Sequence, residues 1–180
     1  MRQRAVFLDK DGTLVVDVPY NVDPARIALA PGAMEGVHAL AEAGFALVVV
    51  TNQSGVARGL FEEAALEPVR ARLEELLGVE FDGWYQCPHG PGDGCACRKP
   101  SPGMLWRAGE ELGLDLSRSW MVGDILNDVE AGQRAGCRTV LIDNGNETEW
   151  LGGAHREPHV RAKDMNEAAQ AITAEERLAA

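Results

Sequence analysis

Basic residues are scarce in this sequence of 180 residues, which has 17 lysines and arginines against 28 aspartates and glutamates and a formal charge of -11. Surfaces that bind nucleic acids or anionic membranes need clusters of positive charge, because these partners are polyanions. The shortage argues against both classes of partner. We therefore expect the protein to bind no nucleic acid and no membrane.

Long hydrophobic runs are also missing. The run from Ala5 to Leu8 ends at Asp9, which is too early for the core of a signal peptide or for a membrane span. A cytoplasmic location is therefore expected. The length fits one domain over residues 1–180, and 46% apolar with 25% charged residues is typical of a soluble globular protein.

Cysteine is rare as well. Of four cysteines, Cys87, Cys95 and Cys97 lie close together and Cys137 stands apart. In a reducing compartment, such a group indicates metal binding before disulfide bonds. Cys137 lies shortly before a predicted strand, and we interpret it as a core residue.

What the sequence does contain is an alternation of short apolar runs with longer amphipathic stretches. Strands are predicted at Ala5 to Leu8, Ala46 to Val50, Trp120 to Val122 and Thr139 to Ile142. Helices are predicted at Met34 to Ala43, Glu62 to Leu77, Gly103 to Leu112 and Asp128 to Ala135. Nearly continuous apolar strands that alternate with helices indicate an α/β protein, with a parallel sheet covered on both faces.

Two stretches fall outside this alternation, and a polar tail follows it. Val15 to Leu29 and Cys87 to Pro102 are interpreted as functional loops, and the second is dense in glycine, proline and cysteine. The polar tail from Asn144 to Ala180 is predicted to hold a short strand near His159 to Arg161 and a helix from Met165 to Ile172.

Pairs of carboxylates follow two of the predicted strands. Asp9 and Asp11 come after the first strand, and Asp124 and Asp128 after the third. Because ligands of open α/β sheets bind at the carboxyl ends of the strands, we expect these side chains to converge. A lone Asp-x-Asp fits an ordinary turn equally well. Carboxylates converging from two strands would repel one another without a cation, however, and their hard oxygens suit Mg²⁺.

Groups suited to a phosphate stand at the same edge. Thr51 follows the second strand, and the segment from Asn52 to Gly55 adds amides, a hydroxyl and loop N–H groups. Lys99 precedes a predicted helix and supplies positive charge. Taken singly, Thr51 could be a helix cap and Lys99 a solvated charge. Together with the carboxylates, they predict a magnesium-assisted phosphoryl-transfer site.

These residues resemble the four motifs of the haloacid dehalogenase superfamily of phosphatases. The matching residues are Asp9-Lys10-Asp11-Gly12-Thr13, Thr51, Lys99 and Gly123-Asp124 with Asp128, in order within about residues 5 to 143. The resemblance implies a Rossmann-like three-layer α/β/α sandwich. It also implies that Asp9 is the nucleophile that accepts the phosphoryl group and that Asp11 is the general acid and base.

The same resemblance implies the ligands of the cation and of the phosphate. Mg²⁺ would be held by the Asp9 side chain, the Asp11 backbone carbonyl and Asp124. Asp128 would orient Lys99 or a water on the metal, behind the direct ligands. Thr51 and Lys99 would bind the equatorial phosphoryl oxygens as their charge develops.

A second metal site is predicted by the pattern C-x-H-x5-C-x-C, formed by Cys87, His89, Cys95 and Cys97. Three thiolates and one imidazole complete a tetrahedral zinc site, and four protein ligands leave no position for a catalytic water. The predicted Zn²⁺ is therefore structural, and it would fix Lys99. The alternatives are cysteines that serve as small apolar loop residues and a nucleic-acid-binding zinc finger, which would need a basic helix.

The zinc pattern narrows the resemblance to one branch. Thr51 to Gly59 and Cys97 to Met104 are similar to the family of D-glycero-D-manno-heptose-1,7-bisphosphate 7-phosphatases. This resemblance implies removal of the 7-phosphate from that small phosphorylated sugar in nucleotide-activated heptose biosynthesis, by a nearly capless monomer. Histidinol-phosphate phosphatases share the zinc pattern and remain the alternative.

Carried over by position, the substrate contacts of that family fall on Asp17, Tyr20, Asn52, Gln53, Ser54 and Arg98. The guanidinium of Arg98 suits a second phosphate, which it can bind through two hydrogen bonds. Two positions depart from the family pattern. Ile125 stands where a basic residue is common, and Asn21 stands where histidine is common. Both positions bear on which anomer and which sugar the protein accepts.

A receiver-like signalling domain is the alternative that is not an enzyme, because it also groups acidic residues, a threonine and a lysine around Mg²⁺. Receivers keep their acidic pair and their phosphorylated aspartate on separate strands. Here Asp9 and Asp11 follow one strand, which favours a nucleophile and an acid/base acting together.

Overall fold

Six strands form one sheet in the order β3-β2-β1-β4-β5-β6, and every neighbouring pair is parallel. The computed structural model describes residues 2–179, so the two end residues of the predicted domain and tail, Met1 and Ala180, lie outside the described residues. The strands are β1 (Ala5–Leu8), β2 (Ala46–Asn52), β3 (Gly83–Cys87), β4 (Trp120–Gly123), β5 (Arg138–Ile142) and β6 (Val160–Ala162).

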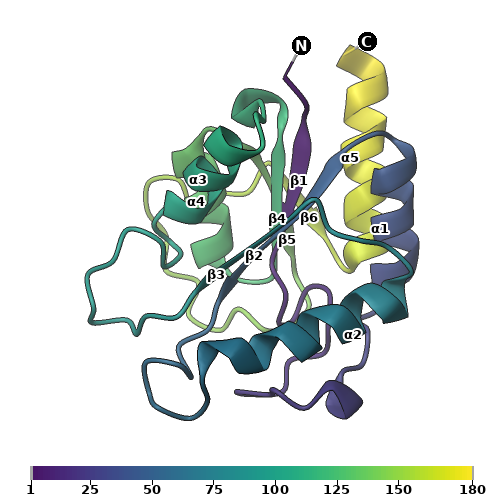
Figure 1. The fold of residues 1–180 in the computed structure, drawn as a ribbon. Coiled ribbons are helices and arrows are strands. Elements are labelled where there is room, and N and C mark those ends of the chain that lie inside the picture. The colour runs from purple at the N-terminus through teal and green to yellow at the C-terminus, as the bar shows by residue number, and fades with distance from the viewer. Residues whose placement is uncertain (1, 180) are drawn as a thin grey trace.

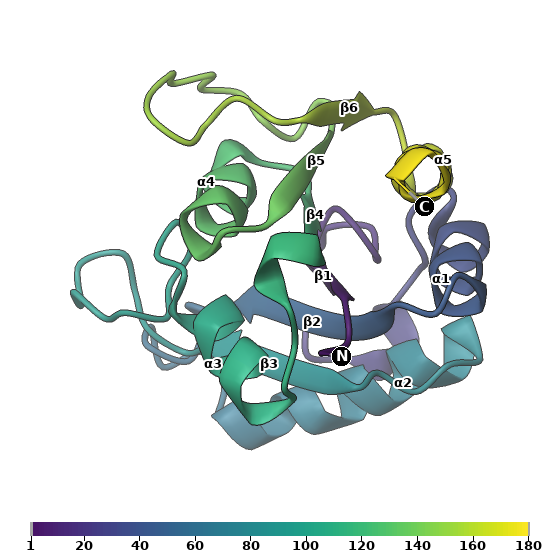
Figure 2. The same ribbon diagram turned by 90° about the horizontal axis from the view of Figure 1, so that it is seen from above.

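Helices cover both faces of this sheet (Figures 1 and 2). They are α1 (Ala33–Glu42), α2 (Glu67–Leu77), α3 (Gly103–Glu111), α4 (Leu126–Ala135) and α5 (Met165–Ala179). α1, α2 and α5 pack on one face around Leu8, and α3 and α4 pack on the other around Phe7. Because successive strand residues point to opposite faces, both sides of β1 are buried. The predicted α/β sandwich with a parallel sheet is confirmed.

The structure differs from the predicted elements in a few places. β3 was not predicted. The predicted helix from Glu62 to Leu77 begins as a 3-10 helix over Glu63–Leu66, and α2 starts only at Glu67, beside a proline that suits the first helical turn. α5 continues from Met165 to Ala179, well beyond its predicted end at Ile172.

The carboxyl ends of the parallel strands form one edge, and the residues of the predicted site follow these ends. The chain leaves β1 through a tight turn, in which the N–H of Gly12 donates to the carbonyl of Val15 at 2.8 Å and Gly12 has a φ of 84°. The loop between β3 and α3, which contains the cysteine pattern, extends away from the sheet (Figure 1).

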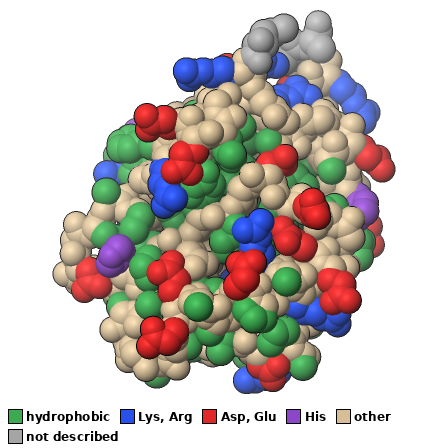
Figure 3. Space-filling model, in the orientation of Figure 1, with side chains coloured by type: hydrophobic (Ala, Val, Ile, Leu, Met, Phe, Trp, Pro, Cys, Tyr) green, Lys and Arg blue, Asp and Glu red, His purple; other side chains and the backbone are tan. Residues whose placement is uncertain are grey.

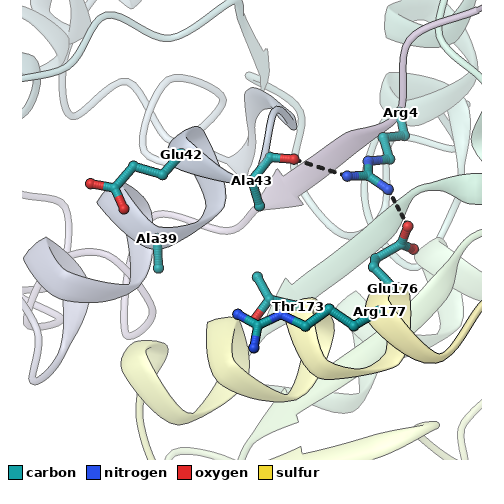
Figure 4. A pocket seen from close by; sticks show the side chains of 7 residues that line it. All are labelled: Arg4, Ala39, Glu42, Ala43, Thr173, Glu176 and Arg177. Carbon is teal, nitrogen blue, oxygen red and sulfur yellow. Dashed lines mark hydrogen bonds and ion pairs between the residues drawn. The ribbon is translucent and has the colours of Figure 1, made fainter. Parts of the chain in front are cut away.

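A hollow of about 470 Å³ lies at the opposite, amino-terminal edge of the sheet, between α1 and α5 (Figure 4). Arg4 precedes β1 there, donates to the carbonyl of Ala43 at 2.9 Å and pairs with Glu176. These contacts tie the start of β1 to both helices. Since the strands are parallel, this hollow is separated from the carboxyl edge by the length of β1.

The surface matches the composition. On the face shown in Figure 3, acidic side chains are interspersed with basic ones. None of the helices within residues 2–179 combines the length and the apolar character that a membrane span needs.

Candidate active site

Three buried carboxylates meet at the carboxyl edge of the sheet. Asp9 follows β1, Asp124 follows the adjacent strand β4, and Asp128 lies in the first turn of α4. One oxygen from each of the three lies within 4.8 Å of the others. We call these three residues the acid cluster. The structure thus brings together residues that lie more than a hundred positions apart in the sequence.

Lys99 enters this cluster from the end of the cysteine loop. Its Nζ lies 2.7 Å from Asp9 Oδ1 and 2.7 Å from Asp128 Oδ1, and it also donates to the carbonyl of Val50 at 2.9 Å. The lysine is only 3% exposed. Three carboxylates therefore face one ammonium group in a buried setting.

The pKa values reflect this imbalance. Burial raises the pKa of Asp9 well above its ordinary value, although Lys99 opposes the shift, while Asp128 and Asp124 add to it. Burial and then Asp128 raise the pKa of Asp124 to about 6. Burial lowers the pKa of Lys99, but Asp128 and Asp9 outweigh it and the pKa is raised. Excess negative charge is thus held at the strand ends, which a divalent cation would relieve.

Two glycines make room for these carboxylates. A Cβ on Gly12 would lie 2.0 Å from Asp124 Oδ2, and one on Gly123 would lie 2.2 Å from Asp128 Oδ2. No side chain fits at either position without moving a carboxylate. The close approach of backbone to carboxylate oxygens, together with an all-oxygen donor set, fits a hard cation such as Mg²⁺.

Asp11 has separate partners. Lys10 Nζ lies 2.6 Å from Asp11 Oδ1, and the Gln53 amide donates to Asp11 Oδ2 at 3.0 Å and to the Thr51 hydroxyl at 2.9 Å. Gln53 thus links the predicted acid/base to the predicted phosphate donor. Lys10 is only 3% exposed, and the sequence pattern predicts no separate role for its side chain.

Asn52 joins β2 to the end of the cysteine loop. Its amide donates to the Lys99 carbonyl at 3.1 Å, and its Oδ1 accepts from the Lys99 N–H at 3.0 Å. Both polar atoms of the Asn52 side chain, a predicted substrate contact, are therefore hydrogen-bonded to the Lys99 backbone. The pair fixes where the lysine side chain begins.

Two adjoining hollows of about 280 Å³ each open at this edge. One contains the acid cluster, and it shares Asp11, Asp17 and Asn52 with the other. The second is lined in addition by the predicted substrate contacts Tyr20, Gln53 and Ser54, and by Asn21. Ile125 lines the first.

Arg98 is placed elsewhere. Its Nη1 donates to the carbonyl of His89 at 3.1 Å, inside the cysteine loop. It lines a third hollow, of about 610 Å³, together with Lys99 and Glu149. The structure therefore divides the predicted substrate contacts between two separate hollows.

The predicted zinc ligands also form a cluster. Cys87 Sγ lies 3.1 Å from Cys97 Sγ, 3.7 Å from Cys95 Sγ and 3.6 Å from His89 Nδ1. One ligand atom from each of the four lies within 4.8 Å of the others, so the set can close around one cation. Burial raises the pKa of Cys87, which disfavours a bare thiolate. Cys137 is separate and buried in the core, as interpreted from the sequence.

The loop after β5 adds residues that sequence reasoning missed. Asn146 Nδ2 donates to Asp124 Oδ2 at 2.7 Å, and Asn144 Nδ2 donates to the Gly12 carbonyl at 2.9 Å. The sequence contains a signal for both asparagines, because they follow the predicted strand from Thr139 to Ile142. The carboxyl end of that strand lies at the same edge of the sheet as Asp9. The sequence predicts only a polar tail from Asn144 onward.

Comparisons with known proteins found similar sequences and structures. Residues 96–168 match the family model described as HAD-hydrolase-like. The D-glycero-beta-D-manno-heptose-1,7-bisphosphate 7-phosphatase of Pseudomonas aeruginosa is 42% identical over 156 residues, which cover 84% of this chain and 88% of the relative. The enzyme of the same name from Escherichia coli K12 is 43% identical over 166 residues, covering 82% and 87%.

A solved structure is similar as well. The D,D-heptose 1,7-bisphosphate phosphatase from B. bronchiseptica, crystallised with magnesium and phosphate, superimposes with a TM-score of 0.85 at 35% identity, over 96% of this chain and 99% of that one. Identity at this level over most of both chains establishes kinship. The chain therefore belongs to the family of the D-glycero-β-D-manno-heptose-1,7-bisphosphate 7-phosphatases, among the hydrolases of the haloacid dehalogenase type.

Proposed function

We propose that the protein removes the 7-phosphate of D-glycero-β-D-manno-heptose 1,7-bisphosphate, with Asp9 as the phosphoryl acceptor. The observation that carries the proposal is the position of Asp9 at the end of β1, paired with Lys99 and facing Asp124 and Asp128. The β anomer follows the names of the relatives. A receiver-like signalling domain is disfavoured, because the family consists of phosphatases.

In the proposed reaction, a carboxylate oxygen of Asp9 attacks phosphorus, and the bond from phosphorus to the sugar oxygen breaks. Asp11, in its acid form, gives its proton to the departing sugar oxygen. The ionised Asp11 then takes a proton from water, and the resulting hydroxide attacks the aspartyl-phosphate. Phosphate leaves, Asp9 returns to a carboxylate and Asp11 to its acid form. Lys10 and Gln53 hold Asp11 for both transfers.

The remaining polar groups bind the phosphoryl oxygens. The Thr51 hydroxyl and the Lys99 ammonium would donate to the equatorial oxygens, where charge develops in the transition state. Both side chains are buried and fixed by hydrogen bonds, Thr51 to Gln53 and Lys99 to the Val50 carbonyl. Little reorganisation is then needed when the phosphate arrives.

Asp9, the Asp11 carbonyl and Asp124 would hold Mg²⁺, and Asp128, at 2.7 Å from the lysine, would position Lys99. When bound, the ion offsets the repulsion between an anionic nucleophile and an anionic phosphate. A solved relative crystallised with magnesium and phosphate supports this choice of cation.

Cys87, His89, Cys95 and Cys97 would hold a structural Zn²⁺. The loop between them is exposed from Pro91 to Gly94, so it lacks an apolar core of its own. A metal supplies the missing stability. Lys99 follows the last ligand by two residues, so the position of the catalytic ammonium would depend on this ion.

The sugar would lie in the hollow lined by Asp17, Tyr20, Gln53 and Ser54, next to the acid cluster. Arg98, in the third hollow, would take the second phosphate. We infer that a monomer suffices, because one chain supplies both clusters. A cytoplasmic location suits the thiols that the zinc site needs.

The test is phosphate release across a panel of both anomers of heptose 1,7-bisphosphate, histidinol phosphate and fructose 1,6-bisphosphate. The β-heptose substrate is expected to give the highest kcat/KM, and Asp9→Asn should abolish release while the exposed control Glu110→Gln keeps it. Equal or greater kcat/KM on histidinol phosphate would overturn the substrate, and turnover by Asp9→Asn would overturn the mechanism.

A further inference from the structure

The loop that connects β5 to β6 (Figure 2) contacts two motifs of the site and the start of α4. Asn144 donates to the carbonyl of Gly12, in the turn after β1. Asn146 donates to the carboxylate of Asp124, and Glu147 Oε2 accepts from the N–H of Leu126 at 2.7 Å. Three nearly consecutive side chains thus join this loop to the ends of β1 and β4 and to α4.

The contact between Asn146 and Asp124 is the closest hydrogen bond at that carboxylate. It measures 2.7 Å to Oδ2, whereas the Thr13 hydroxyl lies 3.4 Å from Oδ1. An amide that holds Oδ2 restricts rotation of the carboxylate, while the Thr13 hydroxyl makes the longer contact with Oδ1. Asn146 also brings no further negative charge to a cluster that already holds three carboxylates.

Asn144 supports the orientation of Asn146. Its Oδ1 accepts from the backbone N–H of Asn146 at 3.2 Å, while its amide reaches the Gly12 carbonyl at 2.9 Å. A Cβ on Gly12 would lie 2.6 Å from Asn146 Nδ2. The turn after β1, the two asparagines and Asp124 are therefore packed together, and moving one moves the others.

We propose that Asn146 is a positioning residue for the cation site, which acts by orienting Asp124, and that Asn144 supports it. The inference rests on the proposed function in one respect, that Asp124 is a ligand of the divalent cation. Hydrogen bonds to metal ligands fix their orientation, and losing one costs about 10- to 100-fold in metal affinity or activity.

The test is Mn²⁺ binding to the full chain, followed by the electron paramagnetic resonance signal of the free ion. Asn146→Ala is expected to raise the Kd for Mn²⁺ about tenfold or more, and Asn144→Ala to raise it less. Thr148→Ala, an exposed side chain of the same loop, serves as the matched control and should leave the Kd unchanged. Saturating Mg²⁺ should restore most of kcat in Asn146→Ala, which a general loss of structure would not allow.

The melting temperature of the metal-free protein separates positioning from folding. If Asn146→Ala melts markedly earlier than the wild type, Asn146→Ser provides the second variant, because serine suits a loop but is too short to reach Asp124. A wild-type Kd in folded Asn146→Ala or Asn146→Ser overturns the inference alone. A wild-type protein that binds no Mn²⁺ overturns the proposed function and this inference with it.

Discussion

Replacing Lys99 with methionine tests whether the acid cluster depends on its one paired ammonium. Methionine keeps much of the side-chain volume, so packing changes little. What is lost is the positive charge that lies 2.7 Å from both Asp9 and Asp128. We expect losses of both stability and rate.

The structure sets the size of the loss. The lysine is 3% exposed, so solvent screens neither contact. Removing one partner of a buried ion pair costs about 3–5 kcal/mol, because the remaining charge is uncompensated. For a protein of this length, each kcal/mol shifts the melting temperature by about 2–4 °C, so Lys99→Met should melt roughly 6–20 °C lower. Loss of a donor to the transition state should lower kcat by about 100- to 1,000-fold.

The loss of stability should depend on pH in a defined direction. Burial already raises the pKa of Asp9 in the folded protein, and Lys99 opposes the shift. Without Lys99, that pKa rises further. A carboxyl with a raised folded pKa takes up a proton on folding, so the folded state gains stability as the pH falls toward the unfolded pKa. The deficit of Lys99→Met should therefore be largest near pH 8 and smaller at pH 5.

The assay is urea unfolding of metal-free protein in the presence of a chelator, at both pH values. Lys163→Met is the control, since it removes the same charge from an exposed lysine on the segment before α5. A deficit below about 1 kcal/mol at pH 8, typical of an exposed pair, would refute the reasoning. So would a deficit that grows as the pH falls.

Three further predictions concern the metals and the turn after β1. Because Asp124 has a pKa raised to about 6 in the absence of metal, protons compete with the cation, so Mn²⁺ affinity should fall about fivefold between pH 6 and pH 5; an unchanged Kd would contradict the assignment of Asp124. Gly12→Ala should lower the free energy of unfolding by about 1–3 kcal/mol, since Gly12 has a φ of 84° and a Cβ there would lie 2.0 Å from Asp124 Oδ2. Gly92→Ala is the control: a Cβ on Gly92 would have no neighbouring atom within 4 Å, so this variant should melt like the wild type. Cys95→Ser should reduce the zinc content measured by atomic absorption. It should also lower kcat at saturating Mg²⁺, because the metal site would no longer fix the loop that positions Lys99. Full activity without zinc would refute the structural role of the metal.

The central strands were predictable because burial on both faces leaves nearly continuous apolar runs, as in β1 and β2. β3 is not predicted from the sequence because it is an edge strand, in which Gly83, Trp84 and Gln86 are partly exposed. Such a strand has neither a continuous apolar run nor a clean alternation. Between Thr173 and Leu178 the extra length of α5 has no fully buried side chain, so no apolar stripe marks it in the sequence.

The acid cluster was predictable for a topological reason, since carboxylates after parallel strands must reach one edge. Pairing of side chains was not predictable in the same way. The amide of Asn52 bonds to the Lys99 backbone, and Lys10 turns toward Asp11. Both depend on side-chain direction. The contact of Asn146 with Asp124 depends on the path of a loop, which no periodicity specifies.

The pairing of Asn52 with Lys99 has a consequence for how the substrate range of such an enzyme could change. The loop from Cys87 to Lys99 is held at its base by that pair and by the four clustered ligands. Its tip, Pro91 to Gly94, is exposed, and Pro91 and Gly94 line the hollow that contains Arg98. Insertions at exposed loop tips are well tolerated. New specificities could therefore be selected or engineered at this tip while the chemistry below it stays intact.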